Sequence, residues 1–316
     1  MNTPVPRGKA KEPELKLVDT VPPATGPDRS AGAAVRAALT EAVDRIVQHD
    51  VGMRAQDVES LHQARVGLRR LRSHLRLFAP LLDGPWSESL HAELRGLARQ
   101  LGEVRNLDVL IDRLGSIVVD LRPVVDPLLD DLATRRDADR RALLELLGDE
   151  RYSALLERLV AAAAAPPLLS SAGRPAGSTL PPLFNAAWRR LAKHGDRMNA
   201  DWTDADYHEL RIRAKRARYA AEAIGPALDG SRRRGADAIR KRLSALQTLL
   251  GELQDSATSR AEILAAAARH PDNGPFNLAA GVTLEREALR ASAARRAVPD
   301  AWREVRRPKH RSWVTA

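Results

Sequence analysis

The chain of 316 residues contains no cysteine, which excludes disulfide bridges, thiolate metal sites and thiol nucleophiles. Aromatic residues are few, with five Trp, three Tyr and three Phe. No apolar run approaches the roughly 20 residues that a membrane-spanning helix needs. The signatures of P-loop nucleotide binding, zinc peptidases and serine hydrolases (GxxxxGK[ST], HExxH and GxSxG) are also missing. We therefore expect neither a membrane protein nor an enzyme.

The first 30 residues mix charged residues with proline and lack the apolar core of a secretory signal. We expect 1–30 to be a flexible tail and the protein to be cytoplasmic. In the rest of the chain, Ala and Leu carry most of the apolar content, and Arg and Glu are the common polar residues. This composition favours helix over strand, so we predict an all-α fold.

Positive charge is concentrated in a few segments. The net charge is +10, but segments 61–78, 207–218, 232–242 and 302–311 carry +5, +4, +5 and +4, so the rest of the chain is net −8. A localised basic region is the electrostatic footprint of a polyanion-binding site.

Two of these segments are copies of one phrase. LHQARVGLRRLRSHLR begins at residue 61 and YHELRIRAKRAR at residue 207, and an offset of 146 aligns His62 with His208 and Arg65 with Arg211. Two further pairs of segments match at nearly the same offset: RIVQHDVGM (45–53) with RLAKHGDRM (190–198), and LGEVRNLD (101–108) with LGELQDSA (250–257). Three matches in the same order indicate a tandem duplication of a unit of about 145 residues.

Each copy divides into segments with helical periodicity. We predict helices at 30–54, 57–79, 87–118, 122–147 and 149–165 in the first copy, and at 183–199, 204–224, 230–270 and 276–296 in the second. A Pro/Gly/Ser-rich stretch at 166–182 is typical of a linker. The sequence therefore predicts two pseudo-symmetric, antiparallel helical bundles, 31–165 and 183–298, followed by a basic C-terminal tail, 299–316.

The duplicated phrases place their cations on one face of a helix. At about 100° per residue, each phrase confines its cations to a stripe roughly 80° wide: His62, Arg65, Arg69, Arg72 and Arg76 in the first copy, and His208, Arg211, Lys215 and Arg218 in the second. Like charges at this spacing repel each other, so we expect an anion to lie on the stripes. Asp57 and Thr203 are capping residues near the two histidines, where the helix dipole also favours an anion. Apolar residues beside the first stripe predict the buried face of its helix: Leu61, Ala64, Leu68, Leu71 and Leu75.

The motifs themselves resemble a known family. H-x-x-R-(x)3-R-R-x-R, followed on the next helix by LGxxR(N/D)LD, is similar to the conserved histidine α-helical domain, CHAD, and H-x-x-R-(x)3-K-R-x-R with LGELQD is similar to its C-terminal half. The resemblance covers about 33–298. It implies two bundles whose basic helices line a shared central groove or pore, binding of inorganic polyphosphate, and localisation to polyphosphate granules. We expect a stand-alone member, without the triphosphate-tunnel domain of the CYTH type that accompanies some members.

By position, the resemblance assigns the polyphosphate contacts to His62, Arg65, Arg69, Arg72, Arg76, Arg105, His208, Arg211, Lys215 and Arg218. Further candidates are Arg99, Lys241, Arg242 and Lys309. The sequence departs from the family pattern at Asn106, where Asp is usual, and at Gln254, where His is frequent. We expect no metal site and no cofactor, because the neighbours of the histidines are cations; Mg²⁺ or another cation would accompany polyphosphate only as its counterion.

Several alternatives remain open at this point. A nucleic-acid-binding protein is the main rival, although the stripes lack aromatic platforms and amides that could reach bases, so nucleic acid is expected only as a non-specific electrostatic competitor. A granule adaptor that recruits other proteins is another. Glu103 and Glu252 recur at matching positions, and we expect them to pair with arginines of the basic helices. The tail with Trp302 and Trp313 could extend the site, close over it, or pack on the bundle.

Overall fold

The computed structural model describes residues 29–122 and 124–314. These residues form helices joined by turns and by two isolated β-bridges, which confirms the predicted all-α class. The predicted flexible tail, 1–30, lies outside the described residues except for its last two, Arg29 and Ser30. In the part of the chain that is described, no helix combines the length and apolar character needed to cross a bilayer.

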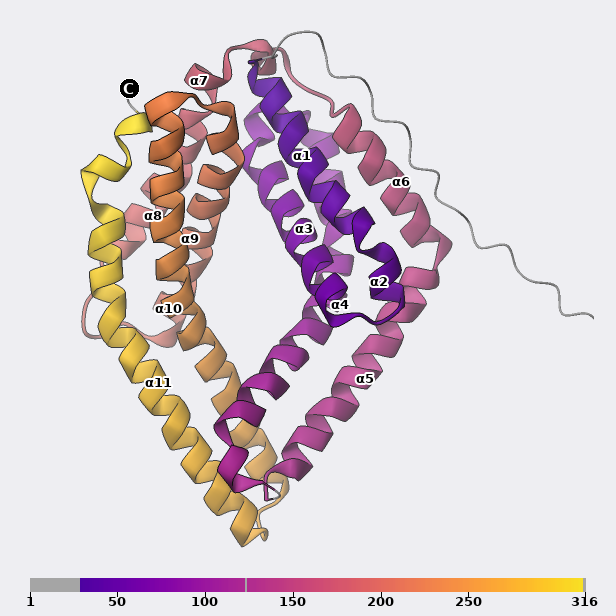
Figure 1. The fold of residues 1–316 in the computed structure, drawn as a ribbon, viewed down its shortest axis with the longest axis vertical. Helices are drawn as coiled ribbons and strands as arrows, with labels where there is room; N and C mark the ends of the chain where they lie inside the picture. The colour runs from indigo at the N-terminus through magenta and orange to yellow at the C-terminus, as the bar shows by residue number, and fades with distance from the viewer. Residues whose placement is uncertain (1–28, 123, 315–316) are drawn as a thin grey trace, which may run out of the picture.

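The chain forms two halves, which lie side by side in Figure 1. The first half contains α1 (Ala31–Gln48), α2 (Asp50–Arg54), α3 (Val58–Leu77), η1 (Ala79–Leu81), α4 (Gly84–Ile117), η2 (Val119–Leu121), α5 (Asp126–Gly148) and α6 (Glu150–Ala164). The second contains η3 (Ser170–Gly173), α7 (Ala176–Thr179), α8 (Pro181–Gly195), α9 (Asp204–Ile224), η4 (Gly225–Ala227), α10 (Gly230–Arg269), α11 (Gly274–Arg306), η5 (Pro308–His310) and η6 (Ser312–Val314). Both halves share one order of packing: α1, α3, α4 and α5 contact one another in sequence, as do α8, α9, α10 and α11.

The two helices that carry the stripes begin at side-chain caps. Asp57 accepts a hydrogen bond from the backbone N–H of Ser60 at 2.8 Å, and Thr203 forms a reciprocal capping box with Asp206. Such caps satisfy backbone donors that the first turn leaves unpaired, and each contributes about 1 kcal/mol. The predicted starts of α3 and α9 are therefore confirmed, and they fix where the first histidine of each stripe lies.

The apolar face predicted for α3 is buried, since Leu61, Ala64, Leu68, Leu71 and Leu75 are each at most 5% exposed. They belong to a large core that extends from α1 and α3 into α8, α9 and α10. A separate small core joins the far ends of α4 and α5 to those of α10 and α11, through side chains such as Leu114, Ile117, Leu132, Ile263 and Phe276. The halves therefore meet where α1 and α3 contact α7 and α9, and again at the far ends of the long helices (Figure 1).

The last helix is longer than the predicted 276–296, because α11 continues through Pro299 to Arg306. Proline removes one hydrogen bond from a helix and normally ends it. Here the next turns bury Trp302, which stacks on Trp188 with ring centroids 6.1 Å apart and lies directly over Gly195. Tertiary packing thus outweighs the local cost of the proline.

The tail that follows α11 also packs on the second half. Trp313 is 2% exposed, and its ring lies 4.8 Å from that of Phe184. Of the three roles considered for the two tail tryptophans, packing on the bundle is the one that the structure shows.

The Pro/Gly/Ser-rich stretch 166–182 is packed rather than extended over the surface. Its backbone pairs with the first half, where Asp83 N donates to Pro167 O and Leu169 N donates to Leu81 O, each at 2.9 Å. Ala172, Ala176 and Leu180 are buried within it. The connection between the halves is therefore held against the core.

Candidate anion-binding site

The two predicted stripes meet where α3 of one half contacts α9 of the other. Lys215 of α9 lies among four arginines, and two of them, Arg65 and Arg69, belong to α3. Burial and then these neighbouring cations lower the pKa of the Lys215 ammonium to about 7. Arg65 in turn lies near Arg69, Arg105 and Arg211, and burial together with these charges lowers its pKa to about 10. The structure thus gathers predicted residues from both copies into one cationic cluster.

This cluster has little internal compensation. Among the described residues, Arg65, Arg69, Arg105, Arg211 and Lys215 form no ion pair. Asp255 of α10 lies near Arg211, but it raises the pKa of Arg211 less than burial lowers it. Half-buried like charges repel each other and lose part of their hydration, so an incoming anion would remove an unfavourable arrangement.

Neutral side chains hold Arg65 of this cluster and Arg218 beside it, although Arg218 also pairs with Glu222 at 3.1 Å. Arg65 donates to Asn106 Oδ1 at 3.1 Å, and Arg218 donates through Nε to Gln247 Oε1 at 3.0 Å. Amide oxygens orient a guanidinium without cancelling its charge. Asn106 departs from the usual Asp of the LGxxRDLD phrase, and here it acts as a hydrogen-bond acceptor for the stripe.

Tyr219, which the sequence reasoning missed, lies between the two stripes. Its ring is buried, with the guanidinium carbon of Arg218 4.3 Å and that of Arg69 5.8 Å from the centroid. The ring therefore contacts one arginine from each copy through cation–π attraction. The sequence feature that could have predicted this role is the position of Tyr219 directly after Arg218, on the buried side of α9.

The two histidines differ in their surroundings. His62 is half-buried, and burial followed by the charge of Arg105 lowers the pKa of its imidazole. His208 is exposed, and its Nδ1 contacts the Gln254 side chain. Gln254, the second departure from the family pattern, thus holds the histidine that begins the second stripe.

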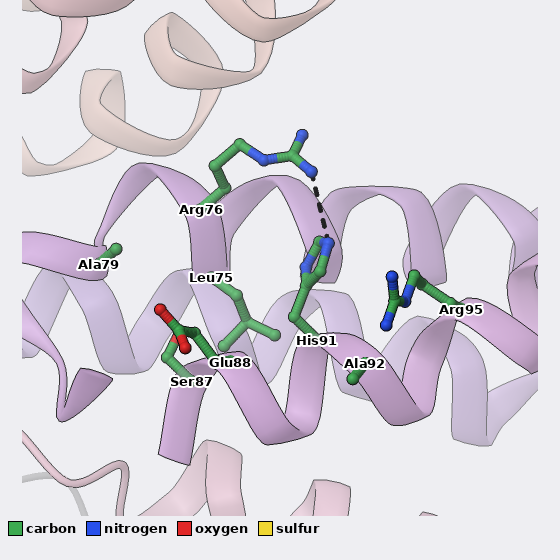
Figure 2. A pocket seen from close by; sticks show the side chains of 8 residues that line it. All are labelled: Leu75, Arg76, Ala79, Ser87, Glu88, His91, Ala92 and Arg95. Carbon is green, nitrogen blue, oxygen red and sulfur yellow. Dashed lines mark hydrogen bonds between the residues drawn. The ribbon is translucent and has the colours of Figure 1, made fainter. Parts of the chain in front are cut away.

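At the C-terminal end of the first stripe, basic side chains of α4 lie beside those of α3. Arg72 lies near Arg95, and Arg76 lies near Arg216 of α9. Arg76 also donates through NH2 to His91 Nε2 at 3.3 Å, as Figure 2 shows. His91 and Arg95 were not predicted as site residues, because an isolated histidine and arginine on α4 carry no motif. Their i, i+4 spacing on one face of α4 was the only local signal.

Comparison with known proteins agrees with this fold and these motifs. The family model for the CHAD domain matches residues 37–264. The chain belongs to the CHAD domain family. Among solved structures, PptA from Streptomyces chartreusis has a TM-score of 0.71 at 23% identity, covering 87% of this chain and 99% of that one. The CHAD domain from the plant Ricinus communis has a TM-score of 0.70 at 28% identity, covering 88% and 93%.

Two curated proteins of Mycobacterium tuberculosis, from strains CDC 1551 and H37Rv and both described as uncharacterized, are 30% identical over 284 residues. The match covers 86% of this chain and 53% of each relative, so the chain spans about half the length of the curated relatives it matches. Residues 29–122 and 124–314 contain no β-strand, so no triphosphate-tunnel domain lies within them.

The four additional candidate residues lie outside the cationic cluster between α3 and α9. Arg99 is exposed and lies 3.9 Å from Glu103 on its own helix. Arg242 donates to Ala238 O at 3.1 Å and, with Lys309, surrounds His310 of the C-terminal segment. Lys241 is exposed on α10. Within the described part of the chain, no hydrogen bond or ion pair connects these four residues with either stripe.

The expected role of the two repeated glutamates was wrong. Among the described residues, Glu103 pairs with Arg99 of its own helix, and Glu252 accepts a hydrogen bond from Arg113 of α4 at 3.1 Å. Arg113 also forms a bidentate pair with the fully buried Glu287 of α11, at 2.7 and 2.8 Å. Glu252 therefore helps to join the two halves of the CHAD fold instead of positioning the basic helices. Over the described residues, no group of three His, Cys, Asp or Glu side chains could hold a metal ion.

Proposed function

We propose that the protein binds inorganic polyphosphate, without catalysis, in the cluster between α3 and α9. The observation that supports this most is the gathering of Arg65, Arg69, Arg211 and Lys215 from both halves without an ion pair within the described structure. Such a site is completed by an anion with many charges. The resemblance of the sequence motifs to the CHAD family implies the same ligand.

The chemistry of polyphosphate fits a row of guanidinium groups. Its internal phosphates repeat the same pair of non-bridging oxygens, which guanidinium groups grip through two parallel hydrogen bonds. On α3, the stripe from His62 to Arg76 extends along about 21 Å of helix, since each residue adds about 1.5 Å. A linear ligand with evenly spaced charges can contact such a row at every turn.

Nucleic acid fits the same cluster less well. Bases need exposed aromatic faces on which to stack, whereas Tyr219 is 3% exposed and both flanking arginines already contact its ring. Nucleic acid would then compete only through its phosphates, with an affinity that falls steeply with salt.

Polyphosphate binding would place the protein on polyphosphate granules in the cytoplasm, where it could act alone or recruit granule proteins. A fluorescent fusion, imaged with stained granules under phosphate plenty and starvation, tests this location. The expected result is co-localisation that is lost when Arg69 and Arg211 are both changed to glutamate. A fusion that stays diffuse while granules are abundant contradicts the granule assignment.

The binding site itself is tested by titration calorimetry with the same double variant, Arg69→Glu/Arg211→Glu. We expect binding of polyphosphate to be lost while the helical circular dichroism is unchanged, because both side chains are only half-buried. Arg240→Glu is the matched control, since Arg240 lies on α10 and pairs with Asp237 at 3.4 Å. Undiminished binding by the double variant would show that the cluster is not the site.

A further inference from the structure

Helix α4 carries a second row of polar and basic side chains opposite the first stripe. At the start of α3, His62 and Arg65 lie near Arg105, and Arg65 also contacts Asn106. Towards the C-terminus of α3, its neighbours on α4 come from earlier positions. Further on, Arg72 lies near Arg95 and Arg76 contacts His91. The two antiparallel helices of the first half therefore form a two-sided track that leads away from the central cluster. We call this the α3–α4 track.

The outer end of this track is a cationic pocket with no compensating ion pair. Arg76, His91 and Arg95 line it and Arg72 lies near them, and none of the three arginines pairs with an acid among the described residues. The pocket beside them has a volume of about 360 Å³. Glu88 also lines it, but lies on the opposite side from Arg95 (Figure 2).

His91 acts as a hydrogen-bond acceptor in this pocket. A guanidinium can only donate, so Nε2 of His91 accepts from Arg76, which requires a neutral imidazole with its proton on Nδ1. Burial and then the charges of Arg72, Arg76 and Arg95 lower the pKa of His91, in agreement with this state. A phosphate that displaced the Arg76 contact would meet two donors, the freed guanidinium and the reprotonated imidazole.

The second copy lacks an equivalent end. The offset of 146 places Glu222 where the first copy has Arg76. Glu222 accepts from Arg218 at 3.1 Å and also pairs with Arg70 of the first half. The offset of 149 places Ser244 where the first copy has Arg95. The second stripe therefore ends at an acid that already pairs with two arginines, whereas the first stripe ends at Arg76.

We propose that polyphosphate leaves the central cluster along the α3–α4 track, and that Arg72, Arg76, His91 and Arg95 form an exit subsite for the phosphates of long chains. This inference rests on the proposed polyphosphate binding. Short chains fill the central cluster alone, whereas long chains also occupy the exit subsite. A long polyphosphate chain then leaves the protein on the side of the first half, between α3 and α4.

A second basic cleft offers a rival path. It has a volume of about 380 Å³ between α3, α8 and α9, and Arg76, Arg190, Arg213 and Arg216 line it. Arg213 is already paired with Glu209 at 2.7 Å. Both pockets also have apolar lining, which comprises Leu77, Pro80, Leu183, Ala186 and Ala187 here and Leu75, Ala79 and Ala92 at the exit subsite. The two pockets differ in Arg213, whose charge is already balanced by Glu209, whereas no arginine of the exit subsite is paired with an acid among the described residues.

Polyphosphate of different lengths can distinguish the exit subsite from the rival cleft by experiment. Calorimetry with short-chain polyphosphate of a few phosphates and with long-chain polyphosphate would be performed on the wild type and on Arg95→Glu, alone and with His91→Gln. Because Arg95 is exposed, the change should leave the fold intact, which circular dichroism and the melting temperature check. We expect Arg95→Glu to weaken long-chain binding by about tenfold or more, which corresponds to about 1.4 kcal/mol, and short-chain binding by less than about twofold.

Two matched variants complete the test. Arg240→Glu occupies the position that aligns with His91 in the second copy, and should leave both affinities unchanged. Arg190→Glu reports on the rival cleft. Equal long-chain affinity in Arg95→Glu and wild type, or a long-chain defect in Arg190→Glu instead, overturns the exit subsite while the proposed function stands. A wild type that binds polyphosphate of no length overturns both.

Discussion

Binding of polyphosphate should draw a proton onto Lys215. In the free protein its pKa is about 7, because burial and the charges of Arg211, Arg69, Arg65 and Arg218 oppose protonation. A bound polyanion offsets those charges and returns the pKa towards the ordinary value of about 10.4. At pH 8 about nine-tenths of Lys215 is neutral before binding, so binding should take up about 0.9 proton; at pH 6 the figure is about 0.1.

The sign of the pH dependence follows from this uptake. As the pH rises through 7, the free protein loses the Lys215 charge that the bound state needs, so the affinity falls. With pKa values of about 7 and 10.4, the affinity declines by about tenfold between pH 6 and pH 8. The variant Lys215→Arg remains charged throughout this range and should lack this contribution.

Titration calorimetry in buffers with different ionisation enthalpies measures the uptake directly. Long-chain polyphosphate is the ligand of choice, because terminal phosphates titrate near pH 6 and long chains have few of them. His62 and His91 also carry lowered pKa values, and the uptake that persists in Lys215→Arg belongs to them. A wild type that takes up no proton at pH 8, or a Lys215→Arg variant that takes up as much as the wild type, would contradict a role for Lys215 in this uptake.

Three other changes have definite expected outcomes. Arg113→Met should lower the free energy of unfolding by about 3–5 kcal/mol in urea titration, because it leaves the fully buried Glu287 unpaired; a loss below about 1 kcal/mol would contradict this. Tyr219→Leu should weaken polyphosphate binding several-fold in calorimetry and Tyr219→Phe should weaken it less, since phenylalanine keeps the ring that lies against Arg69 and Arg218; equal effects of both would refute the contact. Gly195→Ala should lower the melting temperature, because the new Cβ would lie 2.5 Å from the Trp302 ring; an unchanged melting temperature would show that the ring moves aside.

Helical periodicity and charge were enough to predict much of this molecule. The stripes on α3 and α9, the buried leucines beside the first stripe and the caps at Asp57 and Thr203 all depend on residues within a few turns of one another. Such local patterns survive in the sequence because side chains three and four positions apart share a face.

Features that join distant segments were not predictable in the same way. Arg113 and Glu287 are 174 positions apart in the sequence, and no local pattern around either residue predicts that they pair. Glu252 was assigned to the wrong arginines for this reason. The continuation of α11 through Pro299 depends on where Trp302 packs, which the local rule for proline does not contain. His91 and Arg95 became site residues only because α4 folds back along α3.

The central claim is that the cluster between α3 and α9 recognises a repetitive phosphate chain. Its most direct test is calorimetric titration of the protein with long-chain polyphosphate and with a DNA duplex at matched phosphate concentration and about 0.15 M salt. We expect tight binding of polyphosphate and much weaker binding of the duplex, which the stripes can contact only through its backbone. Comparable affinity for the two ligands would contradict it.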